Sequence, residues 1–213
     1  MTDKVYHKII EHYEKCLEKH GASAQGMDWP NEEALQTRFK IMLGITNHTS
    51  LPVSILDLGC GAGLLLDHIN SQKHFHNISY WGIDISGKMI DIATKRHPQS
   101  RFESRDILEN PLPESCVDYI VMNGVLTEKR ELTQREMLNY AQKLIKAAFA
   151  ACKNGIAFNV MSTHVDWHRD DLFHWALDDI VNFLIKDCSR HISIRMDYGL
   201  YEYTIYLYKI PHI

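Results

Sequence analysis

The stretch Ile55-Leu56-Asp57-Leu58-Gly59-Cys60-Gly61-Ala62-Gly63 decides the fold. The apolar run 53–58 is typical of a buried β-strand, and residues 64–69 are typical of the start of a helix. Three glycines lie between the two elements. Glycine tolerates a positive φ and has no Cβ, so the backbone can approach a ligand closely there. The helix start also offers free N–H donors, and the stretch therefore predicts a nucleotide-binding turn.

The spacing of the glycines distinguishes between kinds of nucleotide. A dinucleotide site is typically G-x-G-x-x-G, whereas this chain has G-x-G-x-G with Asp57 two residues before the first glycine. This pattern resembles motif I of the class I S-adenosylmethionine-dependent methyltransferases, in which the loop wraps the amino-acid part of the cofactor. The resemblance implies an enzyme that uses S-adenosyl-L-methionine and releases S-adenosyl-L-homocysteine.

A second acidic residue agrees with this resemblance. Asp84 ends the apolar run 78–84 and lies 84 − 63 = 21 residues after Gly63. That separation matches the distance of about 20 residues found in ribose-binding βαβ units. The resemblance implies that Asp84 accepts hydrogen bonds from both ribose hydroxyls, because a carboxylate has two acceptor oxygens. The alternative is a helix-capping acid beside Ser86.

Composition narrows the class of protein. The chain has 213 residues, of which 45% are hydrophobic and 23% charged, as expected for one domain with a sizeable core. The net charge of −4 and the lack of a dense Lys/Arg run argue against a nucleic-acid partner. Five scattered cysteines without a C-x-x-C pair indicate reduced thiols. The chain shows no signal peptide and no membrane-spanning stretch, so we expect a cytoplasmic protein without a membrane partner.

Strand and helix patterns alternate along the chain. We expect helices at 3–20, 31–43, 63–74, 86–97, 133–151 and 177–188. Lys153-Asn154-Gly155 is expected to end the fifth of these. We expect strands at 53–58, 78–84, 101–106, 117–122 and 156–161, then a hairpin of 191–198 and 201–209.

This order predicts an α/β fold. It is a doubly wound, mostly parallel seven-stranded sheet with a C-terminal antiparallel hairpin and helices on both faces. Residues 1–213 are expected to form a single methyltransferase domain. Within it, 1–50 would be an N-terminal helical extension or lid and 53–209 a Rossmann-like core.

In such sheets a ligand lies across the carboxyl ends of the strands. The resemblance therefore implies a set of cofactor-binding residues that follow strand ends or flank them: Arg38, Asp57, Gly59, Cys60, Gly61, Gly63, Asp84, Ile85, Ser86, Met89, Asp106, Ile107, Asn123 and Gly124.

The resemblance also implies roles within this set. Asp106 would accept the adenine amino group, with the Ile107 N–H on a ring nitrogen, although Asp106 could equally be an exposed loop acid. Ile85 and Met89 would sandwich the adenine or serve only as core residues. The Asn123 carbonyl would take the cofactor ammonium. Arg38 would pair with the cofactor carboxylate, or it is simply a solvated helix arginine.

Candidate general bases follow the strand expected at 156–161. His164 and Asp166 lie in the polar stretch 161–171, and imidazole titrates near neutrality. A surface histidine is the alternative. His164 and His168 are four residues apart, but no further ligand spacing supports a metal site, and none is expected.

We therefore expect methyl transfer to an O or N atom of a small-molecule acceptor, by a monomer or a homodimer. The segment after Asn123 lacks both N/D-P-P-Y and a Pro-Cys pair, which argues against a nucleobase target. Tryptophan and tyrosine faces could also bind a carbohydrate or amino-sugar acceptor. Two alternatives remain: an S-adenosylmethionine-binding interaction protein without turnover, and a nicotinamide-dependent oxidoreductase, which the glycine spacing disfavours.

Overall fold

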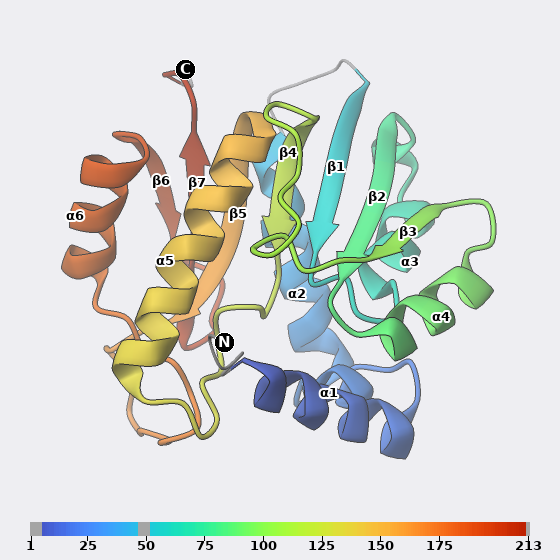
Figure 1. The fold of residues 1–213 in the computed structure, drawn as a ribbon, viewed down its shortest axis with the longest axis horizontal. Helices are drawn as coiled ribbons and strands as arrows, with labels where there is room; N and C mark the ends of the chain where they lie inside the picture. The colour runs from blue at the N-terminus through green and yellow to red at the C-terminus, as the bar shows by residue number, and fades with distance from the viewer. Residues whose placement is uncertain (1–5, 47–51, 212–213) are drawn as a thin grey trace.

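A seven-stranded sheet with the order β3-β2-β1-β4-β5-β7-β6 forms the centre of the computed structural model, which describes residues 6–46 and 52–211 (Figure 1). Its strands are β1 (Val53–Leu58), β2 (Ile78–Asp84), β3 (Arg101–Ser104), β4 (Val117–Met122), β5 (Cys152–Met161), β6 (His191–Arg195) and β7 (Glu202–Tyr208). Strands β1 to β5 run parallel, and β7 runs antiparallel to both β5 and β6. The predicted sheet and its antiparallel hairpin are confirmed.

Helices cover both faces of the sheet. The helices are α1 (His7–His20), α2 (Glu32–Leu43), α3 (Leu64–Ser71), α4 (Gly87–Arg96), α5 (Gln134–Ala151) and α6 (Leu177–Asp187). Alternate residues of β1 point to opposite faces: Ile55 packs with α2 and α3, whereas Leu56 packs with α5 and α6. In the described part of the chain, none of these helices is long and apolar enough to cross a membrane.

The N-terminal helices take two different places. Helix α2 is part of the sheet packing, since Leu35, Phe39 and Met42 are buried against β1 and β4. Asn31 caps it as expected, accepting the Ala34 N–H at 2.8 Å. Helix α1 instead lies across the end of the sheet at which β1 and β2 terminate (Figure 1). Of the predicted N-terminal extension, α1 and the turn after it lie at that end, whereas α2 belongs to the core.

Among the element boundaries that differ from the sequence prediction, two concern the ends of helices. Lys153-Asn154-Gly155 does not end a helix, because α5 stops at Ala151 and Cys152 already pairs with Val117 as the first residue of β5. The glycine there serves a close strand approach: a Cβ at Gly155 would lie 2.7 Å from the Leu207 carbonyl oxygen. The predicted helix 63–74 ends at Ser71 and is followed by a 3₁₀ turn, Lys73–Phe75.

A row of buried polar side chains connects α2 to strands β7 and β5 and to the turn after β4. Arg38 donates from Nε and Nη2 to Oε2 of Glu202 in β7, at 2.9 and 2.8 Å. The other carboxylate oxygen of Glu202 accepts from Asn159 Nδ2 in β5 at 2.9 Å. Asn159 Oδ1 in turn accepts the N–H of Gly124 at 2.8 Å. These hydrogen bonds hold the turn after β4 in place, and the side chains of Arg38, Asn159 and Glu202 are all buried.

Removing the Arg38 guanidinium from this row of side chains should destabilise the protein. Arg38→Met leaves the Glu202 carboxylate buried without a counter-charge, and we expect a loss of about 3–5 kcal/mol in the free energy of unfolding. Glu202→Gln added to Arg38→Met should recover much of it, because glutamine is neutral and still accepts from Asn159. Urea unfolding measures both variants. A loss below about 1 kcal/mol for Arg38→Met would show that the ion pair does not support this packing.

Candidate active site

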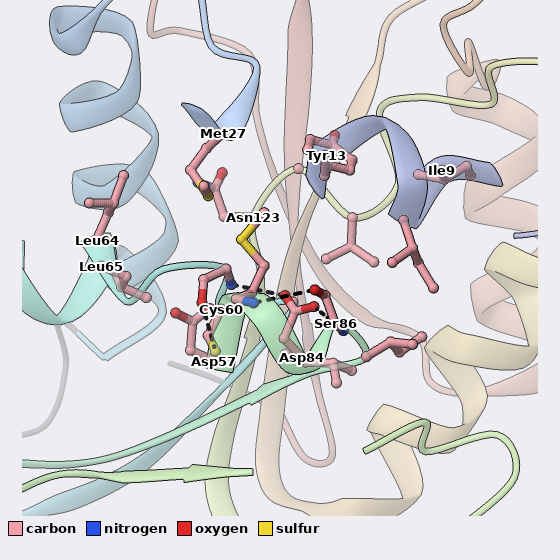
Figure 2. A pocket seen from close by; sticks show the side chains of 18 of the residues that line it. Ile9, Tyr13, Met27, Asp57, Cys60, Leu64, Leu65, Asp84, Ser86 and Asn123 are labelled. Atoms are coloured by element: carbon pink, nitrogen blue, oxygen red, sulfur yellow. Dashed lines mark hydrogen bonds between the residues drawn. The ribbon is translucent and has the colours of Figure 1, made fainter. Parts of the chain in front are cut away.

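A cavity opens at the carboxyl ends of the parallel strands, with about 1150 Å³ of empty space, part of it open to solvent. Every predicted cofactor-binding residue except Arg38 and Gly63 lines it. Figure 2 shows Asp57 and Cys60 on one side and Asp84 and Ser86 on the other, with residues of α1 opposite them. The residues that sequence spacing grouped thus meet in one cavity.

The glycine loop is fixed by backbone contacts to β2. The N–H groups of Gly59 and Cys60 both donate to the Ile83 carbonyl, at 2.7 and 3.0 Å. Gly59, Gly61 and Gly63 have φ values of 80°, 51° and 79°, the left-handed region that favours glycine. A Cβ at Gly61 would lie 2.6 Å from Met27 Sδ, so a side chain at this position would also displace Met27.

Asp84 joins the loop to the next helix. One carboxylate oxygen accepts the Gly61 N–H and the other the Ser86 N–H, both at 2.9 Å. Ser86 then caps α4 through its Oγ, which accepts the Met89 N–H. Burial raises the pKa of Asp84, although these backbone N–H groups oppose the shift. A carboxylate has about four acceptor sites, so Asp84 can still bind a ligand in the cavity.

Asp57 is the other acid of the loop region. Its side chain is buried, and the Tyr80 hydroxyl donates to Oδ2 at 2.8 Å. Burial raises the pKa of Asp57 to about 7, with a smaller contribution from the Asp84 charge. The Tyr80 hydrogen bond acts against the shift. The carboxyl of Asp57 therefore changes its charge near neutral pH, and a nearby cation would favour the ionised form.

Asp106 lies after β3, which ends at Ser104 and not at Asp106 as predicted. Its Oδ1 accepts the Leu108 N–H at 2.9 Å. This is an Asx turn, in which the side chain binds the backbone two residues further on. Its Oδ2 accepts the Tyr6 hydroxyl at 2.5 Å, and the Tyr6 ring stacks on Tyr140 at 4.9 Å. The acid is therefore a cavity residue and not an exposed loop acid.

The end of β4 forms the floor of the cavity between these acids. Gly124 has a φ of 81°, and a Cβ there would lie 2.5 Å from the Trp29 ring. The Trp29 indole therefore packs directly on the backbone at this point, with the Arg38 guanidinium 4.0 Å from its ring centroid. Asn123 Oδ1 is buried without a hydrogen-bond partner in the described structure. A hydrogen-bond acceptor that has no donor at the cavity surface is suited to a ligand with an N–H group.

Two predicted cofactor residues lie outside the cavity lining. Gly63 is the N-cap of α3, and a Cβ there would meet His97 and Phe102 at 3.2 and 3.3 Å. A larger residue at position 63 would press on these two rings, so glycine allows the close packing there. Arg38 is 7% exposed, so the expectation of a solvated arginine is wrong. Its guanidinium is held by Glu202, with Nη1 buried and unpartnered behind Trp29.

The two predicted general bases also lie outside the cavity lining, so the expectation that they face it is corrected. His164 and Asp166 are exposed, and neither side chain lines the cavity. The Tyr201 hydroxyl donates to Asp166 Oδ2 at 2.5 Å, and Trp167 packs edge-on against the Tyr201 ring. These contacts hold the segment after β5 against the start of β7.

Sequence reasoning missed the wall that α1 contributes, which we call the N-terminal wall. It consists of Tyr6, Ile9, Ile10 and Tyr13, joined by Met27 from the following turn. Figure 2 shows Ile9 and Tyr13 on α1 facing the loop that carries Cys60. The apolar period of residues 3–20 indicated a buried helix face, and a lid was one expectation for 1–50, but the pattern did not show which residues of the helix would line a cavity.

A cluster of charged residues attaches this wall to the core. Arg130, after β4, contacts Asp28 and Glu128 at 2.5 Å each and Asp171 at 3.1 Å. His12 of α1 contacts Asp28 at 2.8 Å and also meets Arg130. His12, Asp28 and Cys16 have a spacing that could hold a metal ion. The Arg130 guanidinium already supplies the positive charge at this point.

The comparisons with known proteins agree with this site. A family model described as a methyltransferase domain matches residues 55–148. The Mycobacterium tuberculosis (strain ATCC 25618 / H37Rv) protein named "Putative methyltransferase Rv1506c" is 30% identical over 163 residues, 74% of this chain and 94% of that protein. The Bos taurus 18S rRNA (guanine-N(7))-methyltransferase is 45% identical over 49 residues, 22% of this chain and 16% of that one.

A solved structure shows the same fold. The crystal structure of human N-acetylserotonin methyltransferase in complex with SAM is similar over 98% of this chain and 60% of that chain, with 17% identity and a TM-score of 0.66. The family model covers the glycine loop and the acids after it, and the mycobacterial relative is matched over nearly its whole length. On these grounds the chain belongs to the class I S-adenosylmethionine-dependent methyltransferases.

Proposed function

We propose that this enzyme transfers the methyl group of S-adenosylmethionine to an O or N atom of a small-molecule acceptor. The observation that carries the proposal is the cavity itself. It brings the glycine loop, Asp84 and Asp106 together beneath the N-terminal wall. The empty space of about 1150 Å³, part of it open to solvent, slightly exceeds the about 300–1,000 Å³ that is typical of a small-molecule site, so the cavity has room for a cofactor and a small acceptor.

The residues present fit the cofactor. The glycine loop presents its backbone to the cavity at Gly61, which is part of the lining, and a positive φ there favours glycine. Asp84 would hold the ribose hydroxyls, and Asp106 with Ile107 would hold the adenine. Asp57 and the Asn123 carbonyl would hold the ammonium group, and the orphaned Asn123 Oδ1 offers a further acceptor beside them.

The chemistry asks little of the protein beyond alignment. The bound cofactor supplies an activated methyl group, so that an acceptor lone pair forms the new bond as the carbon–sulfur bond breaks and its electron pair stays on sulfur. The chain's residues orient the two partners and exclude water. The described residues that line the cavity include no histidine and no lysine. An acceptor proton would therefore leave to water or to a carboxylate of the lining such as Asp57, whose pKa burial raises to about 7.

Two of the alternatives lose support. The glycine spacing and the family both disfavour a nicotinamide-dependent oxidoreductase. Family membership also favours turnover over a binding protein without activity. A ribosomal RNA substrate is named for one relative, but that match spans only 22% of this chain. The net charge of −4 gives no drive toward an RNA phosphate backbone.

The ribose assignment can be tested at Asp84. Asp84→Ala removes the acceptor for two hydroxyls, and we expect a loss of about 1.5–3 kcal/mol, or about 10–150-fold in Kd for S-adenosylhomocysteine. Calorimetry measures the affinity, and Asp91→Ala on the exposed side of α4 is the matched control. Because Asp84 also holds Gly61 and Ser86, Asp84→Asn should keep part of the loop structure. Unchanged affinity in folded variants would remove Asp84 from the ribose site.

The raised pKa of Asp57 predicts a pH dependence in the cofactor-free protein. A carboxyl with a folded pKa of about 7 contributes stability below its unfolded value of about 4 and loses it as the pH rises toward 7. Wild type should therefore lose stability relative to Asp57→Asn between pH 5 and 7, by up to about 1.4 kcal/mol per pH unit. Urea unfolding at pH 5, 6 and 7 measures this difference. Parallel stability profiles for the two proteins would contradict it.

The exposed position of His164 predicts that it is not a general base. His164→Ala should have the kcat and KM of wild type, since the side chain does not line the cavity. Release of S-adenosylhomocysteine, measured with an acceptor found by screening, provides both constants. A fall in kcat of about 10²–10⁴-fold with unchanged cofactor affinity would instead identify His164 as the base.

A further inference from the structure

Resting on the proposed methyl transfer, we propose that the acceptor is an apolar amine or alcohol without an anionic group, bound against the N-terminal wall. The cavity would thus select against carboxylates and phosphates. The argument depends on which side chains remain for the acceptor once the cofactor residues are set aside, and on the charge of the whole cavity.

The part of the cavity lining that the cofactor residues leave free offers mainly hydrophobic contact and few hydrogen bonds. Ile9, Ile10 and Tyr13 come from α1, Met27 from the turn after it, and Val125 from the segment after β4. The Tyr13 hydroxyl is the one polar side-chain group among these five residues, and the hydroxyl of Tyr6, the remaining member of the N-terminal wall, already donates to Asp106. A carbohydrate would leave several hydroxyls desolvated without partners here, which costs about 1–3 kcal/mol for each. An apolar ring or chain satisfies the same surface.

The charge of the cavity is negative. Its charged lining residues in the described chain are Asp57, Asp84 and Asp106, with Arg105 as the one cation. The Arg105 Nε lies 2.7 Å from Glu103 Oε1, so its charge is already balanced. A carboxylate or phosphate on the acceptor would lie near these acids without a counter-charge, and burying an unpaired charge is strongly unfavourable.

An amine or an alcohol meets no such penalty. A protonated amine is not repelled by the acids of the cavity and can lie against the Tyr13 ring, and it sheds its proton to water before attack. In the transfer, the nitrogen or oxygen lone pair forms the bond to the methyl carbon and the carbon–sulfur electron pair stays on sulfur. The methylated product then loses its remaining proton to water if it is an alcohol, and an amine can keep it.

The proposed selection against anionic acceptors, called the charge rule below, is tested with three probes. Each has one phenyl ring and one two-carbon arm: 2-phenylethylamine, 2-phenylethanol and 3-phenylpropionate. Their binding to the full-length protein saturated with S-adenosylhomocysteine is measured by calorimetry. We expect the amine and the alcohol to bind at least tenfold more tightly than the carboxylate. Ile10→Lys places a cation in the N-terminal wall and should shift the preference toward the carboxylate. Ile185→Lys, on an exposed site of α6, should leave it unchanged.

The outcomes separate this inference from the proposed function. Equal or tighter binding of 3-phenylpropionate to wild type overturns the charge rule, and so does an unchanged preference in Ile10→Lys. Binding of none of the three probes, with S-adenosylhomocysteine bound, overturns the apolar acceptor site. Failure of S-adenosylhomocysteine itself to bind contradicts the proposed function instead, before any probe is added.

Discussion

The hydrogen bonds of one half-buried carboxylate organise the cofactor side of this enzyme. Asp84 accepts from Gly61 in the loop after β1 and from Ser86 at the start of α4. The Ser86 hydroxyl then donates to Glu14 of α1 at 2.6 Å. A single strand end thereby sets the positions of the glycine loop, of α4 and of the helix that covers the cavity. Replacing Asp84 would disturb all three, so its structural and ligand-binding roles cannot be separated by an alanine alone.

Helix α1 is attached to the core by polar contacts at its start and in its middle. Tyr6 donates to Asp106, Glu14 contacts Ser86 and Lys88, and His12 joins the cluster around Arg130. Such partly exposed contacts contribute little each, about 0–1 kcal/mol for an ion pair. Two of them use residues on the cofactor side of the cavity. A ligand that takes an acceptor site of Asp106 therefore competes with Tyr6, which couples the position of α1 to what the cavity holds.

The sequence predicted the parts of this structure that depend on short-range signals. The glycine loop, Asp84 and the order of strands were found because they follow from local conformation, hydrophobic period and a fixed spacing. The partners of α1 and of Arg38 were not, since Tyr6 and Asp106 are 100 residues apart and Arg38 and Glu202 are 164 apart. The position of His164 outside the cavity lining was not predicted for a related reason. Its place after β5 fixes where the backbone leaves the sheet, but contacts formed later in the chain, such as that of Asp166 with Tyr201, contribute to where the loop then lies.

The distribution of charge in the cavity bears on how the site could align the cofactor and the acceptor. The carboxylates lie on the strand ends, where they can balance a cofactor that carries positive charge, and the N-terminal wall opposite them is apolar. Excluding water strengthens the interaction between these acids and a cation, because the effective dielectric constant falls. The same exclusion leaves an uncharged acceptor nucleophile poorly solvated and close to the methyl group. Alignment and desolvation thus come from the same wall, so we expect changes in α1 to affect both acceptor binding and turnover.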